Sequence, residues 1–91
     1  MNEEKTYEAA VQTFTEFLTA HKHKKTQERF AILENINSHD GHFSAELLHE
    51  TMQRHCRVSL ATVYNTLDLL CQSHLIVKHQ FGTQESQYEK A

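Results

Sequence analysis

The sequence has few of the residues that interrupt or cross-link a chain. Its 91 residues include no Pro, no Trp, two Gly and two Cys. Cys56 and Cys71 are too far apart for a CxxC pair and too few for a disulfide framework, which indicates a reducing compartment, the cytoplasm. The sequence also lacks a run of roughly 20 apolar residues and the basic, apolar start of a signal peptide. We therefore expect neither export nor membrane insertion.

The length and the charge exclude several classes of protein. A chain of 91 residues that is 38% hydrophobic suits one small domain, residues 1–91, and excludes a large two-lobed enzyme. No nucleophile, base and orienting group can be named together, so we expect no enzyme. The formal net charge of -3 argues against a uniformly basic coat for nucleic acid, although binding depends on where the charges lie.

Four amphipathic helices are predicted from apolar residues that recur at helical spacing. Each is expected to begin at a Ser or Thr whose side-chain oxygen can cap the first turn. The capping residues are Thr6, Thr26, Ser44 and Ser59. The apolar stripes are Val11, Phe14 and Leu18; Ile32, Leu33 and Ile36; Leu47, Leu48 and Met52; and Leu60, Val63, Leu67, Leu70 and Cys71. Leu69 lies outside the last stripe, and we expect it to be exposed.

The end of the sequence predicts a hairpin. Two short strands, residues 75–81 and 86–89, are expected on either side of a polar turn at residues 82–85. The fold class is therefore mainly α with a small β-hairpin, a winged helix with an extra N-terminal helix. In such a fold, the last helix before the hairpin can enter a DNA major groove.

That last helix carries small and hydrogen-bonding residues on the face opposite its stripe. These are Ser59, Ala61, Thr62 and Asn65, with Tyr64 at the flank. Small residues permit close approach to DNA, but an ordinary amphipathic helix with a solvated face has the same pattern. The pattern alone leaves both interpretations open.

The one dense basic run lies between the first two predicted helices. Its cations, Lys22, Lys24 and Lys25, are joined by Arg29 one turn into the next helix. They are numerous enough to neutralise DNA phosphates or to place a lysine in a minor groove. A solvated loop is the alternative, although cations at a helix start are unfavourable without an anion.

Three ordered motifs carry a family resemblance. The segment from Lys24 to Arg29 resembles a pattern of Lys or Arg, any residue, Thr, two residues and Arg. The segment from His42 to Leu47 resembles His-x-Ser-Ala, and Ser59 to Leu67 resembles the most recognisable segment of the same family. The sequence from about Lys22 to Glu89 thus resembles the ferric uptake regulator family of bacterial metal-dependent repressors.

The resemblance implies a function and a set of partners. It implies the sequence-specific DNA-binding domain of a metal-responsive regulator of metal-uptake or peroxide-stress genes. The family's second domain, which dimerises and holds most of the metal, would follow Ala91. We therefore expect Fe, Zn or Mn in a full-length homodimer, no cofactor in this chain alone, and a monomer or weak dimer. The implied partner is double-stranded DNA with an A/T-rich palindromic operator, and no membrane is implied.

The resemblance also assigns roles to single residues. Lys24 resembles the residue that enters the minor groove, and Tyr64 resembles a tyrosine that packs on bases. Asn65 stands where the family commonly has Arg. Because Asn reads adenine and Arg reads guanine, we expect a preference for adenine of roughly 1–3 kcal/mol at that position. His42 and Glu89 align with two ligands of the family's regulatory metal site, whose other ligands we expect beyond Ala91.

A winged helix that docks a protein partner is the alternative function. The acidic net charge and an exposed Leu69 favour it. Salt discriminates between the two functions, because a DNA-binding surface loses affinity as salt rises and an apolar docking surface does not.

Overall fold

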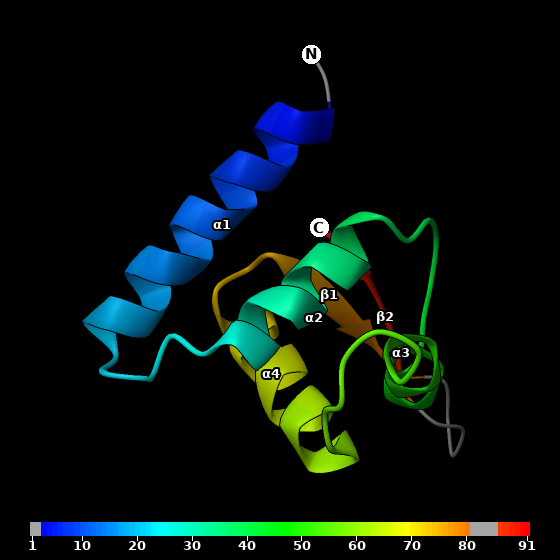
Figure 1. Ribbon diagram of the computed structural model, residues 1–91. Coiled ribbons are helices and arrows are strands. Elements are labelled where there is room, and N and C mark those ends of the chain that lie inside the picture. Colours follow the sequence, from blue (N-terminus) through cyan, green and yellow to red (C-terminus); the bar gives the residue numbers. More distant parts are fainter. Residues whose placement is uncertain (1–2, 81–85) are drawn as a thin grey trace.

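The computed structural model describes residues 3–80 and 86–91, with side chains described from Tyr7 onward. The elements in order are α1 (Glu3–Ala20), α2 (Gln27–Asn37), α3 (Ala45–Met52), α4 (Leu60–Gln72), β1 (Ile76–His79) and β2 (Gln87–Lys90). Helix α1 lies along one side of the molecule, with α2 between it and the hairpin (Figure 1). Within the described residues, no helix is both long enough and apolar enough to cross a membrane. The predicted winged helix with an added N-terminal helix is confirmed.

Three of the four predicted helix starts are confirmed. The side-chain oxygens of Thr26, Ser44 and Ser59 accept hydrogen bonds from the backbone N–H groups three residues later. The prediction for Thr6 is wrong, because α1 already begins at Glu3. Glu and Lys are good helix formers, and acids are favourable in a first turn, so the helix extends past Thr6 toward the N-terminus.

Helices α1 and α4 end with the same backbone motif. After α1, Lys22 has a φ of 60° and the His23 N–H donates to Leu18 O at 2.8 Å. After α4, His74 has a φ of 65° and the Leu75 N–H donates to Leu70 O at 3.0 Å. This is the Schellman motif, whose left-handed position is usually occupied by Gly. The motif directs the chain sharply from α1 into the basic loop and from α4 into β1.

The hydrophobic core lies where the four helices meet the hairpin. Its fully buried side chains include Phe14, Leu18, Ile32, Ile36, Phe43, Leu48, Met52, Val63, Leu67 and Leu70. Two predictions are wrong: Leu69 is 3% exposed, and Leu47 is 44% exposed. Helix α4 packs against α2, α3 and β1, so its buried surface is wider than a single stripe and includes Leu69. Leu47 belongs to the first turn of α3, on the solvent side.

The hairpin is antiparallel and carries a third short partner. Val77 pairs with Glu89 and Lys78 with Tyr88, while Phe43 forms an isolated bridge to Tyr88. Both backbone hydrogen bonds of that bridge are present, at 2.8 and 2.7 Å. The first strand is shorter than predicted at its start because the Leu75 N–H closes the Schellman motif after α4, and the second strand extends one residue further, to Lys90. The predicted turn at 82–85 lies outside the described residues, as does Phe81.

Candidate nucleic-acid interface and metal-ligand cluster

The start of α4 and the loop between α1 and α2 form one concave surface. We call it the basic cleft, and its volume is about 690 Å³. It is lined by Lys22, His23, Lys24, Thr26, Glu28, Arg29, Arg57, Val58, Ser59, Ala61, Thr62 and Asn65. Four of these residues are permanent cations and one is an acid. The cleft is therefore positive although the chain as a whole is acidic.

Most of the residues predicted to contact DNA lie in the basic cleft. The structure brings together Lys22, Lys24, Arg29, Ser59, Ala61, Thr62 and Asn65 from two separate segments of the chain. Lys25 and Tyr64 do not line the cleft. The Lys25 ammonium donates to Thr19 Oγ1 at 3.4 Å, away from α4. Arg57 was missed, because in the sequence it is only a connector residue before the Ser59 cap.

Arg29 joins the two sides of the basic cleft. Its Nη1 donates to the backbone carbonyl of Lys24, and its Nη2 donates to Asn65 Oδ1 at 3.2 Å. The guanidinium is partly exposed and the Asn65 side chain is exposed. The planar guanidinium can donate in two directions at once, which a lysine cannot do with fixed geometry. Arg29 therefore sets the position of Asn65 relative to the basic loop.

Tyr64 faces a neighbouring hollow and is oriented by α3. Its hydroxyl donates to Glu46 Oε2 at 2.5 Å, and the residue is 42% exposed. The hollow also includes Asp68, Cys71 and Lys78. The ring is thus accessible for contact with a ligand, while its hydroxyl is already paired with a carboxylate.

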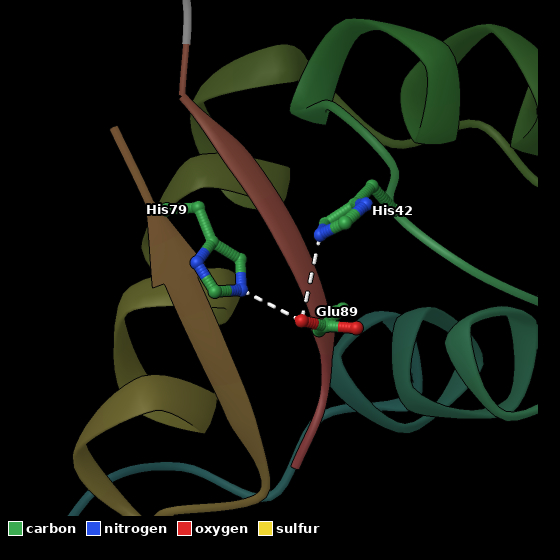
Figure 2. Close-up of side chains that lie close together, drawn as sticks. All are labelled: His42, His79 and Glu89. Atoms are coloured by element: carbon green, nitrogen blue, oxygen red, sulfur yellow. Dashed lines mark hydrogen bonds and ion pairs between the residues drawn. The ribbon is translucent and has the colours of Figure 1, made fainter. Parts of the chain in front are cut away.

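His42, His79 and Glu89 form a cluster of three possible metal ligands. One ligand atom from each lies within 4.8 Å of the other two. His79 Nε2 lies 2.7 Å and His42 Nε2 lies 3.4 Å from the same oxygen, Glu89 Oε1 (Figure 2). The side chains of His42, His79 and Glu89 are 51%, 33% and 39% exposed.

The cluster suits a divalent transition metal. Two imidazoles and one carboxylate are a common three-ligand set for zinc, and they leave a fourth position for water or another ligand. In a tetrahedral site with bonds of about 2 Å, ligand atoms lie about 3.3 Å apart, so only small side-chain movements are needed. The residues present therefore fit a metal ion.

The sheet register explains how the three residues meet. Val77 lies directly opposite Glu89, and His79 is two residues further along the same face of β1. His79 and Glu89 are thus diagonal neighbours on one face of the hairpin. His42 precedes Phe43, whose bridge to Tyr88 holds this segment against β2.

His79 is a candidate ligand that the sequence analysis missed. The structure places it beside the two expected candidates, since His79 Nε2 contacts Glu89 Oε1 directly. The alternation of residues along two paired strands could have indicated His79, but only with a known register. Because a shift of one residue moves a side chain to the opposite face, the sequence did not determine this.

Cys71 is a partly buried thiol with a raised pKa. Burial and the nearby Asp68 carboxylate raise the pKa of the Cys71 thiol, although Lys78 acts in the opposite direction. A raised pKa keeps the thiol protonated and unreactive near neutral pH. Cys56 is a partly buried free thiol at the edge of the core.

Comparison with known proteins places this chain in a family. Residues 20–91 match the model of the Ferric uptake regulator family. The chain belongs to this family. It is 34% identical to the ferric uptake regulation protein of Haemophilus influenzae over 70 residues, which cover 75% of this chain and 48% of that protein. The chain thus spans about half the length of the curated relatives it matches.

Solved structures of Ferric uptake regulator proteins share the fold. The regulator of Pseudomonas aeruginosa, solved with manganese, gives a TM-score of 0.70 at 32% identity, covering 81% of this chain and 57% of that chain. The regulator of Helicobacter pylori gives a TM-score of 0.83 over all of this chain and 61% of that chain. Its 21% identity supports the fold alone. The resemblance seen in the three sequence motifs is therefore confirmed as family membership.

Proposed function

We propose that this chain is the sequence-specific DNA-binding module of a metal-responsive bacterial transcriptional regulator, and not an enzyme. The observation that carries the proposal is the basic cleft. In it, cations from the loop between α1 and α2 meet the exposed first turns of the helix that a winged helix inserts into DNA. Membership of the Ferric uptake regulator family supports the same role.

The proposal assigns different DNA contacts to the two sides of the basic cleft. Lys22, Arg29 and Arg57 neutralise phosphates, and Lys24 reaches toward the minor groove. Ser59, Ala61, Thr62 and Asn65 approach the base edges, with Tyr64 packing beside them. Lys25 has a smaller role, since its ammonium is directed to Thr19.

The proposed partner is an A/T-rich palindromic duplex in the bacterial cytoplasm. A palindrome matches two copies of the module related by a two-fold axis, so the full-length protein is proposed to act as a homodimer. A single module lacks the avidity of two, and we expect it to bind at about 10⁻⁴ to 10⁻⁶ M. The alternative of a protein-docking module loses its main support, because Leu69 is buried.

We further propose that His42, His79 and Glu89 bind a divalent metal ion, with Zn, Mn or Fe as candidates. The donor set and the shared Glu89 oxygen support this site. The ion would join both strands of the hairpin to the segment that leads into α3. In the intact regulator, such a site could receive further ligands from the second domain.

The DNA-binding proposal is tested by anisotropy of a fluorescent A/T-rich palindromic duplex titrated with the chain. With the four cations of the basic cleft at the DNA, the affinity should fall about 100-fold between 50 and 200 mM salt. Lys24→Met should weaken binding at low salt and reduce the slope of log affinity against log salt by about one.

Lys90→Met is the matched control, because it removes the same charge outside the basic cleft. The Lys90 ammonium donates to Asn37 O at 3.0 Å, in a hollow beside α1. The Lys90→Met variant should have the same DNA affinity and the same slope of log affinity against log salt as the unaltered chain. Salt-independent binding, or equal losses for Lys24→Met and Lys90→Met, would contradict the proposal.

The metal proposal is tested by calorimetric titration of the chain with Zn²⁺ at neutral pH. We expect one ion per chain and a loss of at least about tenfold in affinity for His79→Ala, since two remaining ligands make a poor site. Binding should weaken as the pH falls, because protonated imidazoles cannot coordinate. Co²⁺ should give a spectrum typical of tetrahedral coordination.

His55→Ala serves as the control for the metal titration. His55 is exposed and follows α3, where its described hydrogen bond is the backbone contact to Met52 O. Its removal should change neither stoichiometry nor affinity. If His79→Ala bound Zn²⁺ as tightly as the unaltered chain, the three-ligand site would be refuted.

A further inference from the structure

The side chain of Asn65 is not a free amide. Its Oδ1 accepts a hydrogen bond from Arg29 Nη2 at 3.2 Å, while the other terminal nitrogen of Arg29 donates to Lys24 O. Because Oδ1 is paired with the guanidinium, the amide nitrogen of Asn65 is the part of the side chain directed away from Arg29. Asn65 is exposed and lines the basic cleft, so its Nδ2 can reach a ligand there.

The two purines differ at the position that such an amide would read. In the major groove, adenine presents the N7 acceptor and the N6 amino donor, whereas guanine presents two acceptors, N7 and O6. An unrestrained Asn reads adenine by accepting from N6 and donating to N7. That mode needs Oδ1 to accept a second hydrogen bond, from N6, beside the one that it already accepts from Arg29. Two donors, the guanidinium and N6, would then converge on one oxygen.

The positive charge of Arg29 favours guanine over adenine, as the hydrogen bond from Arg29 to Asn65 does. The guanidinium nitrogen lies 3.2 Å from Oδ1, so a base that Asn65 contacts would meet a positive charge beside the amide. The N6 amino group of adenine carries partial positive charge there, while O6 of guanine carries partial negative charge. Guanine is thus favoured by both hydrogen bonding and electrostatics.

We propose that Arg29 fixes Asn65 as a hydrogen-bond donor, so that this protein prefers guanine over adenine at the base pair that Asn65 contacts. The preference is opposite to that expected for Asn65 alone. Arg29 is the positioning residue and Asn65 the contacting residue. The inference rests on the proposed DNA-binding function, and its test separates the two.

The test measures binding of the chain and its variants to an array of duplexes that contains every eight-base sequence, at 50 and 200 mM salt. The unaltered chain should prefer guanine over adenine about fivefold or more at one position of its preferred sequence. Arg29→Met frees Oδ1, and the preference at that position should shift to adenine. Asn65→Asp keeps the acceptor for Arg29 but removes the Nδ2 donors, so the guanine preference should disappear.

Lys25→Met is the matched control for charge, because Lys25 lies in the same loop and its ammonium contacts Thr19 rather than Asn65. It should change the overall affinity at most, and leave the base preference as it is. If no variant shifts the preference while binding stays salt-sensitive, the role of Arg29 and Asn65 is refuted and DNA binding stands. If the unaltered chain shows no salt-sensitive binding to any duplex, both proposals are refuted.

Discussion

Two exposed residues adopt a backbone conformation that usually belongs to glycine. Lys22 and His74 have φ values of 60° and 65° at the ends of α1 and α4. The left-handed region costs a residue with a Cβ about 1–2 kcal/mol. Such strain persists where the surrounding structure requires it, often at functional positions. Lys22 fits this description, because its side chain brings a cation to the basic cleft.

Relief of this strain should stabilise the protein. We expect His74→Gly to raise the free energy of unfolding by about 0.5–1 kcal/mol, after the greater unfolded-state entropy of Gly is subtracted. Urea unfolding followed by circular dichroism measures the change. Ser73→Gly is the control, because Ser73 has a negative φ of -86°, and this variant should instead be less stable. A loss of stability in His74→Gly would contradict the strain argument.

Sequence patterns predicted the structural roles of single residues well where those roles depend on nearby residues in the chain. Thr26, Ser44 and Ser59 were identified as caps because capping depends only on the next three residues. Leu69 and Leu47 were assigned to the wrong environments, since their exposure depends on which elements pack against α3 and α4. Tertiary contacts of this kind leave no clear periodic signal.

At the scale of elements, the start of α4 combines a helix cap with proposed DNA contacts. Ser59 Oγ accepts from the Thr62 N–H at 3.0 Å and lies 2.9 Å from Thr62 Oγ1. Two proposed DNA contacts therefore also form the cap of the helix that is proposed to read DNA. Under that proposal, a change at Ser59 alters helix formation and DNA affinity together.

We expect Ser59→Ala to lower the free energy of unfolding by about 1 kcal/mol, because the first turn of α4 loses its cap. Thermal and urea unfolding both report this change. Ser59→Asn retains a capping oxygen and should remain within a few tenths of a kcal/mol of the unaltered chain. Equal stability of Ser59→Ala and Ser59→Asn would show that the cap contributes little.

The elements themselves were predicted better than their ends. Sequence patterns indicated all four helices and the hairpin, but not that α1 begins before Thr6 or that Leu75 closes the motif after α4. Strand register also stayed undetermined, and with it the approach of His79 to Glu89. Both depend on backbone hydrogen bonds between segments that are distant in sequence.

At the scale of the whole molecule, Tyr88 couples folding to alkaline pH. Burial, followed by the negative charges of Cys71, Asp68 and Glu46 when ionised, raises the pKa of the Tyr88 hydroxyl. The protonated form is therefore favoured in the folded state. The contribution of the protonated hydroxyl to the free energy of unfolding is fully present below the ordinary tyrosine pKa of about 10. It is lost as the pH rises through the higher pKa of the folded state.

Tyr88→Phe should consequently make stability less dependent on pH above about pH 10. Unfolding curves at a series of pH values from 8 to 11 measure the effect. The unaltered chain should lose stability more steeply than the variant above pH 10, and the two curves should run parallel below pH 9. Parallel curves over the whole range would show that Tyr88 ionisation does not oppose folding.

The basic cleft could be predicted in part from the sequence because its two segments are both recognisable. The cations at 22–29 and the small residues after Ser59 were each identified, and the fold brings them together. The link from Arg29 to Asn65 was not predictable, since it joins residues of different helices through side-chain geometry. The Asn65 base preference expected from the residue type alone accordingly differs from the one inferred with Arg29 present.

The cluster of His42, His79 and Glu89 also has a consequence for the lifetime of the protein. An ion bound there would cross-link the segment before α3 to the last strand, closing a loop of roughly fifty residues. A permanent cross-link of that span stabilises a protein by about 4 kcal/mol in the chain-entropy model. Binding of the metal ion to this cluster would thus reduce the fraction of unfolded protein that proteases attack. If the proposed ion binds there, the protein should be degraded more slowly when the metal is abundant than when it is scarce.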